Sequence, residues 1–156
     1  YFATTFAHRM NDKYKVNFYI AEHNQVIKPG CVYLAPGDDH LEVIKQAGQY
    51  RCKLHHGDLV CFQRPAVDVL FNSVANVAAG NASAALLTGM GSDGAKGLLN
   101  MKQQGCVTMI QDEATSLVWG MPGAAAELEA ADRIVPLDRI AEVLLNSCYK
   151  RGDIHA

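Results

Sequence analysis

Residues 86–97 are Leu86-Leu87-Thr88-Gly89-Met90-Gly91-Ser92-Asp93-Gly94-Ala95-Lys96-Gly97, and this stretch decides the fold of the 156-residue chain. An apolar run over 83–88 leads into a loop with three glycines, and a helical pattern over 95–103 follows directly. A strand, a glycine-rich turn and a helix in this order are typical of an α/β fold. Backbone N–H groups of such a loop and its helix N-terminus favour negatively charged ligands. The stretch therefore predicts a ligand site around residues 89–94.

The loop also satisfies the dinucleotide-binding pattern G-x-G-x-x-G from Gly89 to Gly94. A second apolar run ends near Asp112, about where that fingerprint has its ribose-binding acid. However, Asp93 would face the pyrophosphate at close range, where like charges repel. The fingerprint also opens its domain, whereas roughly 80 residues precede this loop. Dinucleotide binding is therefore kept as the less favoured alternative.

Asp93 itself fits two roles. It is a favoured N-cap for a helix that begins at Gly94 or Ala95, because its carboxylate accepts backbone N–H bonds, worth about 1 kcal/mol. It also stands at the C-terminal end of a strand, where α/β folds place their ligands. There it can orient a histidine, as the acid of a Ser-His-Asp triad does. Asp112 and Glu113 follow the next strand and can line the same crevice, although an acidic helix N-terminus explains them more simply.

Hydrophobic periodicity predicts the remaining elements. The first half contains a helix over 2–11, a strand over 16–20, and short alternating runs that indicate an antiparallel meander of hairpins, over 32–35, 41–45 and 50–54. From residue 66 helices alternate with strands: helices over 66–79, 95–103 and 137–149, strands over 83–88, 106–110 and 133–136, and a further helix that begins at Pro122. The residues from Lys150 onward are expected to fray. The predicted fold class is α/β, with a doubly wound, mostly parallel sheet, helices on both faces and an antiparallel hairpin region.

Five motifs follow one another over almost the whole chain. They are Ala35-Pro36-Gly37-Asp38-Asp39-His40, Arg64-Pro65-Ala66-Val67-Asp68-Val69-Leu70-Phe71, Thr88-Gly89-Met90-Gly91-Ser92-Asp93-Gly94-Ala95, Gln111-Asp112-Glu113-Ala114-Thr115-Ser116 and Gly120-Met121-Pro122. In kind and order they resemble the CheB-type chemotaxis protein-glutamate methylesterases. The resemblance implies a serine hydrolase that removes methyl esters from glutamate side chains of chemoreceptors and often deamidates glutamines there.

The resemblance also implies roles for individual residues. Asp93 matches the aspartate of the catalytic triad, and the backbone N–H of Met90 matches a donor near the oxyanion site. Gly91 in the same loop and Met121 on the facing loop are expected to contact substrate. No metal and no organic cofactor is implied. The implied partners are a methylated chemoreceptor and an N-terminal receiver domain.

The family's nucleophilic serine and its histidine belong to motifs that precede the segment matching Tyr1, so Asp93 alone represents the triad in these 156 residues. We therefore expect one partial catalytic domain over 1–156, N-terminally incomplete, without the receiver domain, and poorly stable and inactive alone. An inactive receptor-binding fragment is the alternative function.

The chain's own serines and histidines do not supply the missing groups. No serine sits in a G-x-S-x-G elbow, the arrangement that exposes a strained nucleophile. Among the histidines, His40 follows a turn and is the best candidate for a site near the edge of the sheet. A lone loop histidine is nevertheless more often solvated than functional.

Composition limits the other function classes. The chain has 14 basic and 16 acidic residues and a net charge of −2, which gives no nucleic-acid footprint. No apolar run approaches the roughly 18 residues that span a bilayer, and the first residues lack a signal-peptide pattern. Five cysteines without a C-x-x-C pair favour a reducing compartment. The sequence therefore predicts a cytoplasmic protein that neither binds nucleic acid nor inserts into a membrane.

Overall fold

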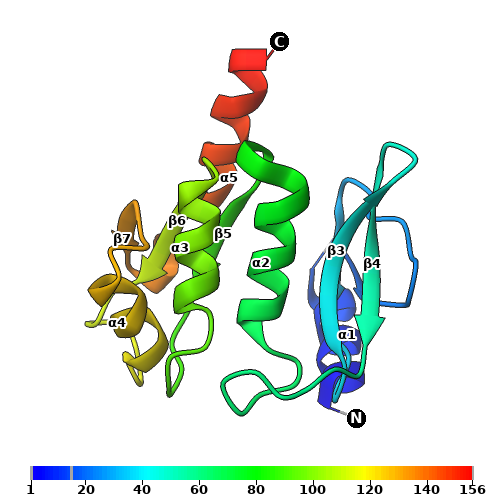
Figure 1. The fold of residues 1–156 in the computed structure, drawn as a ribbon, viewed down its shortest axis with the longest axis horizontal. Coiled ribbons are helices and arrows are strands. Elements are labelled where there is room, and N and C mark those ends of the chain that lie inside the picture. Colours follow the sequence, from blue (N-terminus) through cyan, green and yellow to red (C-terminus); the bar gives the residue numbers. More distant parts are fainter. Residues whose placement is uncertain (1, 15, 156) are drawn as a thin grey trace.

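The computed structural model describes residues 2–14 and 16–155, with side chains described up to residue 148. Its elements, in chain order, are α1 (Phe2–Lys13), β1 (Asn17–Ile20), β2 (Cys31–Leu34), β3 (His40–Gln46), β4 (Gln49–His55), α2 (Val67–Ala78), a short 3-10 turn (Ala79–Asn81), β5 (Ser83–Leu86), α3 (Ala95–Gln103), β6 (Val107–Gln111), α4 (Gly120–Glu127), β7 (Arg133–Val135) and α5 (Leu137–His155). The described strands form a parallel pair β1–β2, an antiparallel hairpin β3–β4 and a parallel sheet β5–β6–β7. Figure 1 shows α2 between α3 and the β3–β4 hairpin.

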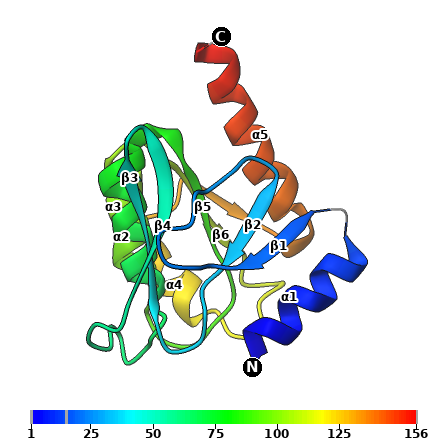
Figure 2. The ribbon, with the colours of Figure 1, turned by 90° about the vertical axis from the view of Figure 1, so that its right-hand side faces the viewer.

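The parallel sheet β5–β6–β7 is covered on both faces. Along β5 and β6, residues Leu86 and Ile110 pack with α2, α3 and α4, and they are 2 % and 0 % exposed. Met109, which points to the other face, packs with Val135 of β7 and Ile140 of α5. Figure 2 shows α5 on the opposite side of this sheet from α2 and α3. This alternation produces the α/β arrangement of helices on both faces that the sequence predicts.

The prediction of an antiparallel meander over 32–54 is wrong in its first part. β3 and β4 form the expected hairpin, but β2 pairs with β1 and runs parallel to it, with Asn17 opposite Cys31. Within the connection 21–30, residues 24–27 run antiparallel along β4, where the N–H of Asn24 donates to the carbonyl of Cys52 (2.7 Å) and Val26 lies opposite Arg51. This excursion returns the chain in its original direction, so a tight reversal does not form between β1 and β2.

Two helix boundaries also differ from those that the sequence predicts. The helix expected to begin at Pro122 begins at Gly120, and the terminal helix continues to His155, where a frayed tail was expected from Lys150. None of the helices in the described part of the chain combines the length and the hydropathy that a bilayer-spanning segment needs.

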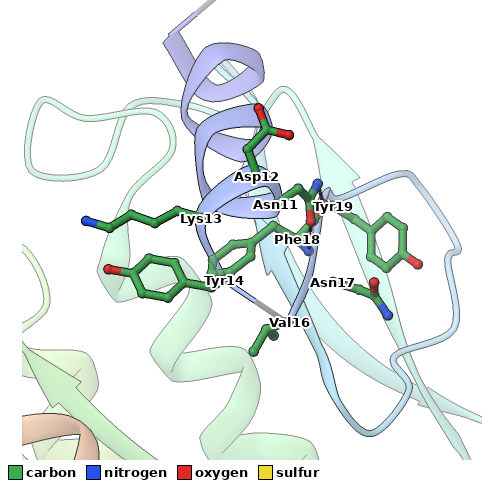
Figure 3. Close-up of a pocket in the computed structure, with 8 residues that line it drawn as sticks. All are labelled: Asn11, Asp12, Lys13, Tyr14, Val16, Asn17, Phe18 and Tyr19. Carbon is green, nitrogen blue, oxygen red and sulfur yellow. Dashed lines mark hydrogen bonds between the residues drawn. The ribbon is translucent and has the colours of Figure 1, made fainter.

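α1 lies at one corner of the molecule against β1. The side chain of Asn11 donates to the carbonyl of Phe18 (2.9 Å) and accepts a bond from its N–H (2.8 Å), which fixes the angle between the helix and the strand. An open pocket of about 680 Å³ lies at this corner, and Figure 3 shows the side chains around it, Asn11, Asp12, Lys13, Tyr14, Val16, Asn17, Phe18 and Tyr19. None of the residues that decide the predicted site lines this pocket.

Candidate functional site

Asp93 lies in the loop between β5 and α3, at the carboxyl end of β5, and it is only 5 % exposed. Its Oδ2 accepts a hydrogen bond from the N–H of Val67 (2.8 Å), and its Oδ1 accepts one from the N–H of Asp68 (2.9 Å). Both donors belong to the first turn of α2. Asp93 therefore caps the neighbouring helix, and the expectation that it caps its own helix is wrong. The N-cap of α3 is Gly94, which has φ 93° and no side chain with which to cap the helix.

Asp68 makes the reciprocal contact, from α2 to the first turn of α3. Its side chain is buried in the first turn of α2, and its Oδ1 accepts a hydrogen bond from the N–H of Gly97 (2.8 Å). The two helices approach closely here, because a Cβ on Gly97 would lie 2.7 Å from the Cβ of Phe71. Asp68 of α2 thus caps α3, and Asp93 of the loop before α3 caps α2. The positive ends of two helix dipoles converge on two buried carboxylates.

Cys61 lies beside these carboxylates. Its thiol is 3.6 Å from Oδ2 of Asp68 and donates to it. Partial burial of the thiol and the negative charge of Asp68 raise the pKa of Cys61 above its ordinary value of 9.0. The ligand atoms of Cys61, Asp68 and Asp93 lie within 4.8 Å of one another, a spacing that a metal ion could bridge. Because both carboxylates already accept backbone N–H bonds, helix capping accounts for their position without a metal.

His40, the histidine that the sequence singles out, is buried (1 % exposed), so the expectation of a solvated loop histidine is wrong. Its Nδ1 lies 3.2 Å from the backbone nitrogen of Ala66, and its Nε2 lies 2.7 Å from the carbonyl oxygen of Asp58. A backbone N–H can only donate and a carbonyl can only accept. The contacts therefore assign the tautomer, in which Nδ1 accepts and Nε2 carries the proton.

The loop around Met90 meets the start of α4. The side chain of Met90 is largely exposed, and Gly91, with φ 87°, has open space where a side chain would stand. The N–H of Met121 donates to the carbonyl of Gly89 (2.8 Å). A Cβ on Gly120 would lie 2.8 Å from that same carbonyl oxygen, so the two backbones touch. The structure thus brings together the loop of Met90 and Gly91 and the start of α4, which carries Met121.

Gln111 joins these two loops; the sequence places it in the motif over 111–116 but predicts no role for it. The fully buried side chain accepts a bond from the N–H of Thr88 through Oε1 (2.9 Å) and donates through Nε2 to the carbonyl of Thr115 (2.8 Å). Its backbone carbonyl accepts a bond from the indole N–H of Trp119 (2.8 Å). The side chain of the neighbouring Asp112 accepts the N–H of Thr115 within its own turn (3.0 Å). A lone amide that ends an apolar strand is the signal that could have identified Gln111.

A parallel sheet with a glycine-rich loop and a buried carboxylate at its carboxyl edge defines an α/β protein whose ligand site lies at the strand ends. Residues 1–144 match the family described as CheB methylesterase, and the chain belongs to that family. The resemblance and the fold class that the sequence predicts are confirmed.

Relatives are similar over nearly all of the chain. It is 52 % identical over 144 residues to a protein-glutamate methylesterase/protein-glutamine glutaminase 2 of Xanthomonas oryzae pv. oryzae, covering 92 % of this chain and 40 % of that protein. A protein of the same name from Saccharophagus degradans is 48 % identical over 149 residues, or 96 % of this chain and 43 % of that protein. The chain thus spans less than half the length of these relatives.

A solved structure agrees with the fold. The crystal structure of the Thermotoga maritima CheB methylesterase catalytic domain is 35 % identical in sequence and superposes with a TM-score of 0.90. The match covers 93 % of this chain and 77 % of that domain.

Proposed function

We propose that this chain supplies the triad acid and the oxyanion loop of a protein-glutamate methylesterase that acts on chemoreceptors in bacterial chemotaxis and also deamidates glutamines there. The names of the relatives support the reaction class. Because those relatives extend well beyond the matched region, we assign the nucleophilic serine, the histidine and a receiver domain to chain outside residues 1–156. We place the reaction in the cytoplasm, where thiols such as those of the five cysteines of this chain persist.

The mechanism follows from the chemistry of a Ser-His-Asp triad. The serine oxygen attacks the ester carbonyl of a methylated glutamate, and the histidine takes the serine proton and passes it to the departing methanol. Water then attacks the acyl-enzyme and releases the glutamate and the free serine. With glutamine as substrate the leaving group is ammonia. No metal or organic cofactor takes part in this proposal.

The carboxylate of Asp93 carries the proposal. Its two oxygens are fixed by the N–H groups of Val67 and Asp68, so its remaining lone pairs have one set direction. A carboxylate held in this way can accept the Nδ1–H of a histidine and stabilise the imidazolium that forms. The N–H of Met90 is our candidate for an oxyanion donor, a contribution typically worth about 3 kcal/mol. Gly91 leaves open space next to Met90. We propose that the side chain of Met121 contacts the substrate.

The test replaces Asp93 by asparagine in the protein that contains this chain. Asp132→Asn is a matched control, because Oδ2 of Asp132 also accepts a backbone N–H bond, from Thr108 (2.9 Å), but at the amino edge of the sheet. We expect Asp93→Asn to lower kcat roughly 10⁴-fold, the loss typical of a triad whose acid becomes an amide. Methanol release from a methylated chemoreceptor would be measured, with the folded fraction followed by circular dichroism. Turnover in folded Asp93→Asn equal to that of Asp132→Asn would remove Asp93 from the mechanism.

A further inference from the structure

We infer that His40 is a positioning residue for Asp93, because it fixes the start of the helix that holds the Asp93 carboxylate. The inference rests on the proposed catalytic role of Asp93. His40 belongs to β3, lies outside the loop that carries Asp93, and acts through the backbone of α2.

The imidazole of His40 bonds to both ends of the segment 58–66, which leads into α2. Its Nε2–H donates to the carbonyl of Asp58 (2.7 Å), and its Nδ1 accepts the N–H of Ala66 (3.2 Å). His40 and Ala66 are 1 % and 2 % exposed, so water has little access to replace either bond. The His55 ring packs on the His40 ring with a centroid distance of 5.3 Å, which limits rotation of the imidazole.

Three consecutive N–H groups at the start of α2 are held by side chains from other elements. Ala66 is the N-cap residue, and its own side chain has no group with which to cap the helix. Its N–H is taken by His40, and the next two, of Val67 and Asp68, are taken by Asp93. Because the three N–H groups belong to consecutive residues at the start of one helix, a displacement of the Ala66 N–H should shift the two donors that orient the Asp93 carboxylate.

If the start of α2 is displaced, the Asp93 carboxylate loses its orientation for catalysis. An active-site group must be held within about 0.5 Å of its productive position, and misplacement by about 1 Å can lower the rate about 100-fold. His40 does not touch the substrate in this arrangement. A change at His40 that frees Ala66 should therefore lower kcat and leave KM unchanged.

Two substitutions separate the two ring contacts. In His40→Asn the side-chain oxygen lies near the place of Nδ1 and keeps an acceptor for Ala66, but the contact with Asp58 is lost. In His40→Gln the longer amide reaches the place of Nε2 and keeps a donor for Asp58, but the acceptor for Ala66 is lost. We expect His40→Asn to retain kcat within about threefold and His40→Gln to lose about tenfold or more, both with unchanged KM.

The measurements use the full protein, and each substitution is also made together with Asp93→Asn. If His40 acts through Asp93, the loss in kcat caused by His40→Gln disappears in the Asp93→Asn background. Equal kcat losses in both His40 variants, or the same fold loss with and without Asp93, would overturn the inference.

A second measurement does not depend on activity. Amide hydrogen exchange at Val67 and Asp68 should become faster in His40→Gln and stay unchanged in His40→Asn. Unchanged exchange in His40→Gln overturns the inference, whatever the kinetics show. If Asp93→Asn is fully active, the proposed function fails, and the exchange rates still decide whether His40 sets the start of α2. Should His40→Gln not fold, normal exchange and kcat in His40→Asn support the inference, and their loss overturns it.

Discussion

Removal of the Asp93 side chain should destabilise the fold as well as abolish turnover. In Asp93→Ala the N–H groups of Val67 and Asp68 lose their carboxylate acceptor. Asp68 is buried, so its N–H loses a bond to a charged group, worth about 1.5–3 kcal/mol. Val67 is half-buried, so water can replace part of the second bond, and its loss costs about 0.5–1 kcal/mol. We therefore expect Asp93→Ala to lower the free energy of unfolding by about 2–4 kcal/mol, above the typical value of about 1 kcal/mol for a single N-cap.

Urea and thermal unfolding measure this loss directly. For a domain of this size each kcal/mol corresponds to roughly 2–4 °C, so Tm should fall by roughly 4–16 °C. Asp93→Asn keeps one acceptor and should fall between wild type and Asp93→Ala. Glu113→Ala removes an exposed carboxylate and should stay within about 0.5 kcal/mol of wild type. An Asp93→Ala protein with the urea midpoint of Glu113→Ala would show that Asp93 does not cap α2.

Two further predictions concern titrating groups near the site. Partial burial, and then the charge of Asp68, raise the pKa of the Cys61 thiol, so Cys61 should react slowly with iodoacetamide at pH 8. The substitution Asp68→Asn should accelerate this reaction. Equal rates in the two proteins would contradict the contact between Cys61 and Asp68. Hydrogen bonds from Arg64 hold the pKa of Asp38 below its ordinary 3.8, so this pair contributes stability above about pH 3.8 that is lost as the pH falls through the lower folded pKa. In an NMR titration Arg64→Gln should return the Asp38 pKa toward 3.8, and an unmoved pKa would exclude the pairing.

The second half of the chain could be predicted closely from local pattern. The helix over 95–103 has the predicted bounds, and the helix predicted over 66–79 is observed over 67–78. In both segments apolar residues recur at helical spacing, and Gly105 or Gly80 follows the end. These signals act within a few residues, so they do not depend on the rest of the fold.

Pairing between distant segments could not be predicted in the same way. The sequence predicts strands at β1 and β2, but their parallel pairing depends on the path of residues 21–30, part of which pairs along β4. His40 was placed in a solvated loop because its turn is polar. Its burial results from contacts with Asp58 and Ala66, 18 and 26 residues away in the chain. Alternation and turn signals carry no information about such partners.

The same limit explains why the sequence predicts a candidate site but not the contacts that support it. The loop motif marks Asp93 and Met90 because glycines and a carboxylate after a strand are visible in the sequence. What holds them comes from elsewhere: the start of α2 fixes the Asp93 carboxylate, and Gln111 ties the loop of Met90 to the next loop. The motif over 88–95 therefore marks the candidate groups of the site, whereas the buried contacts that orient these groups do not follow from the motif. Substitutions at such supports should affect turnover without direct substrate contact.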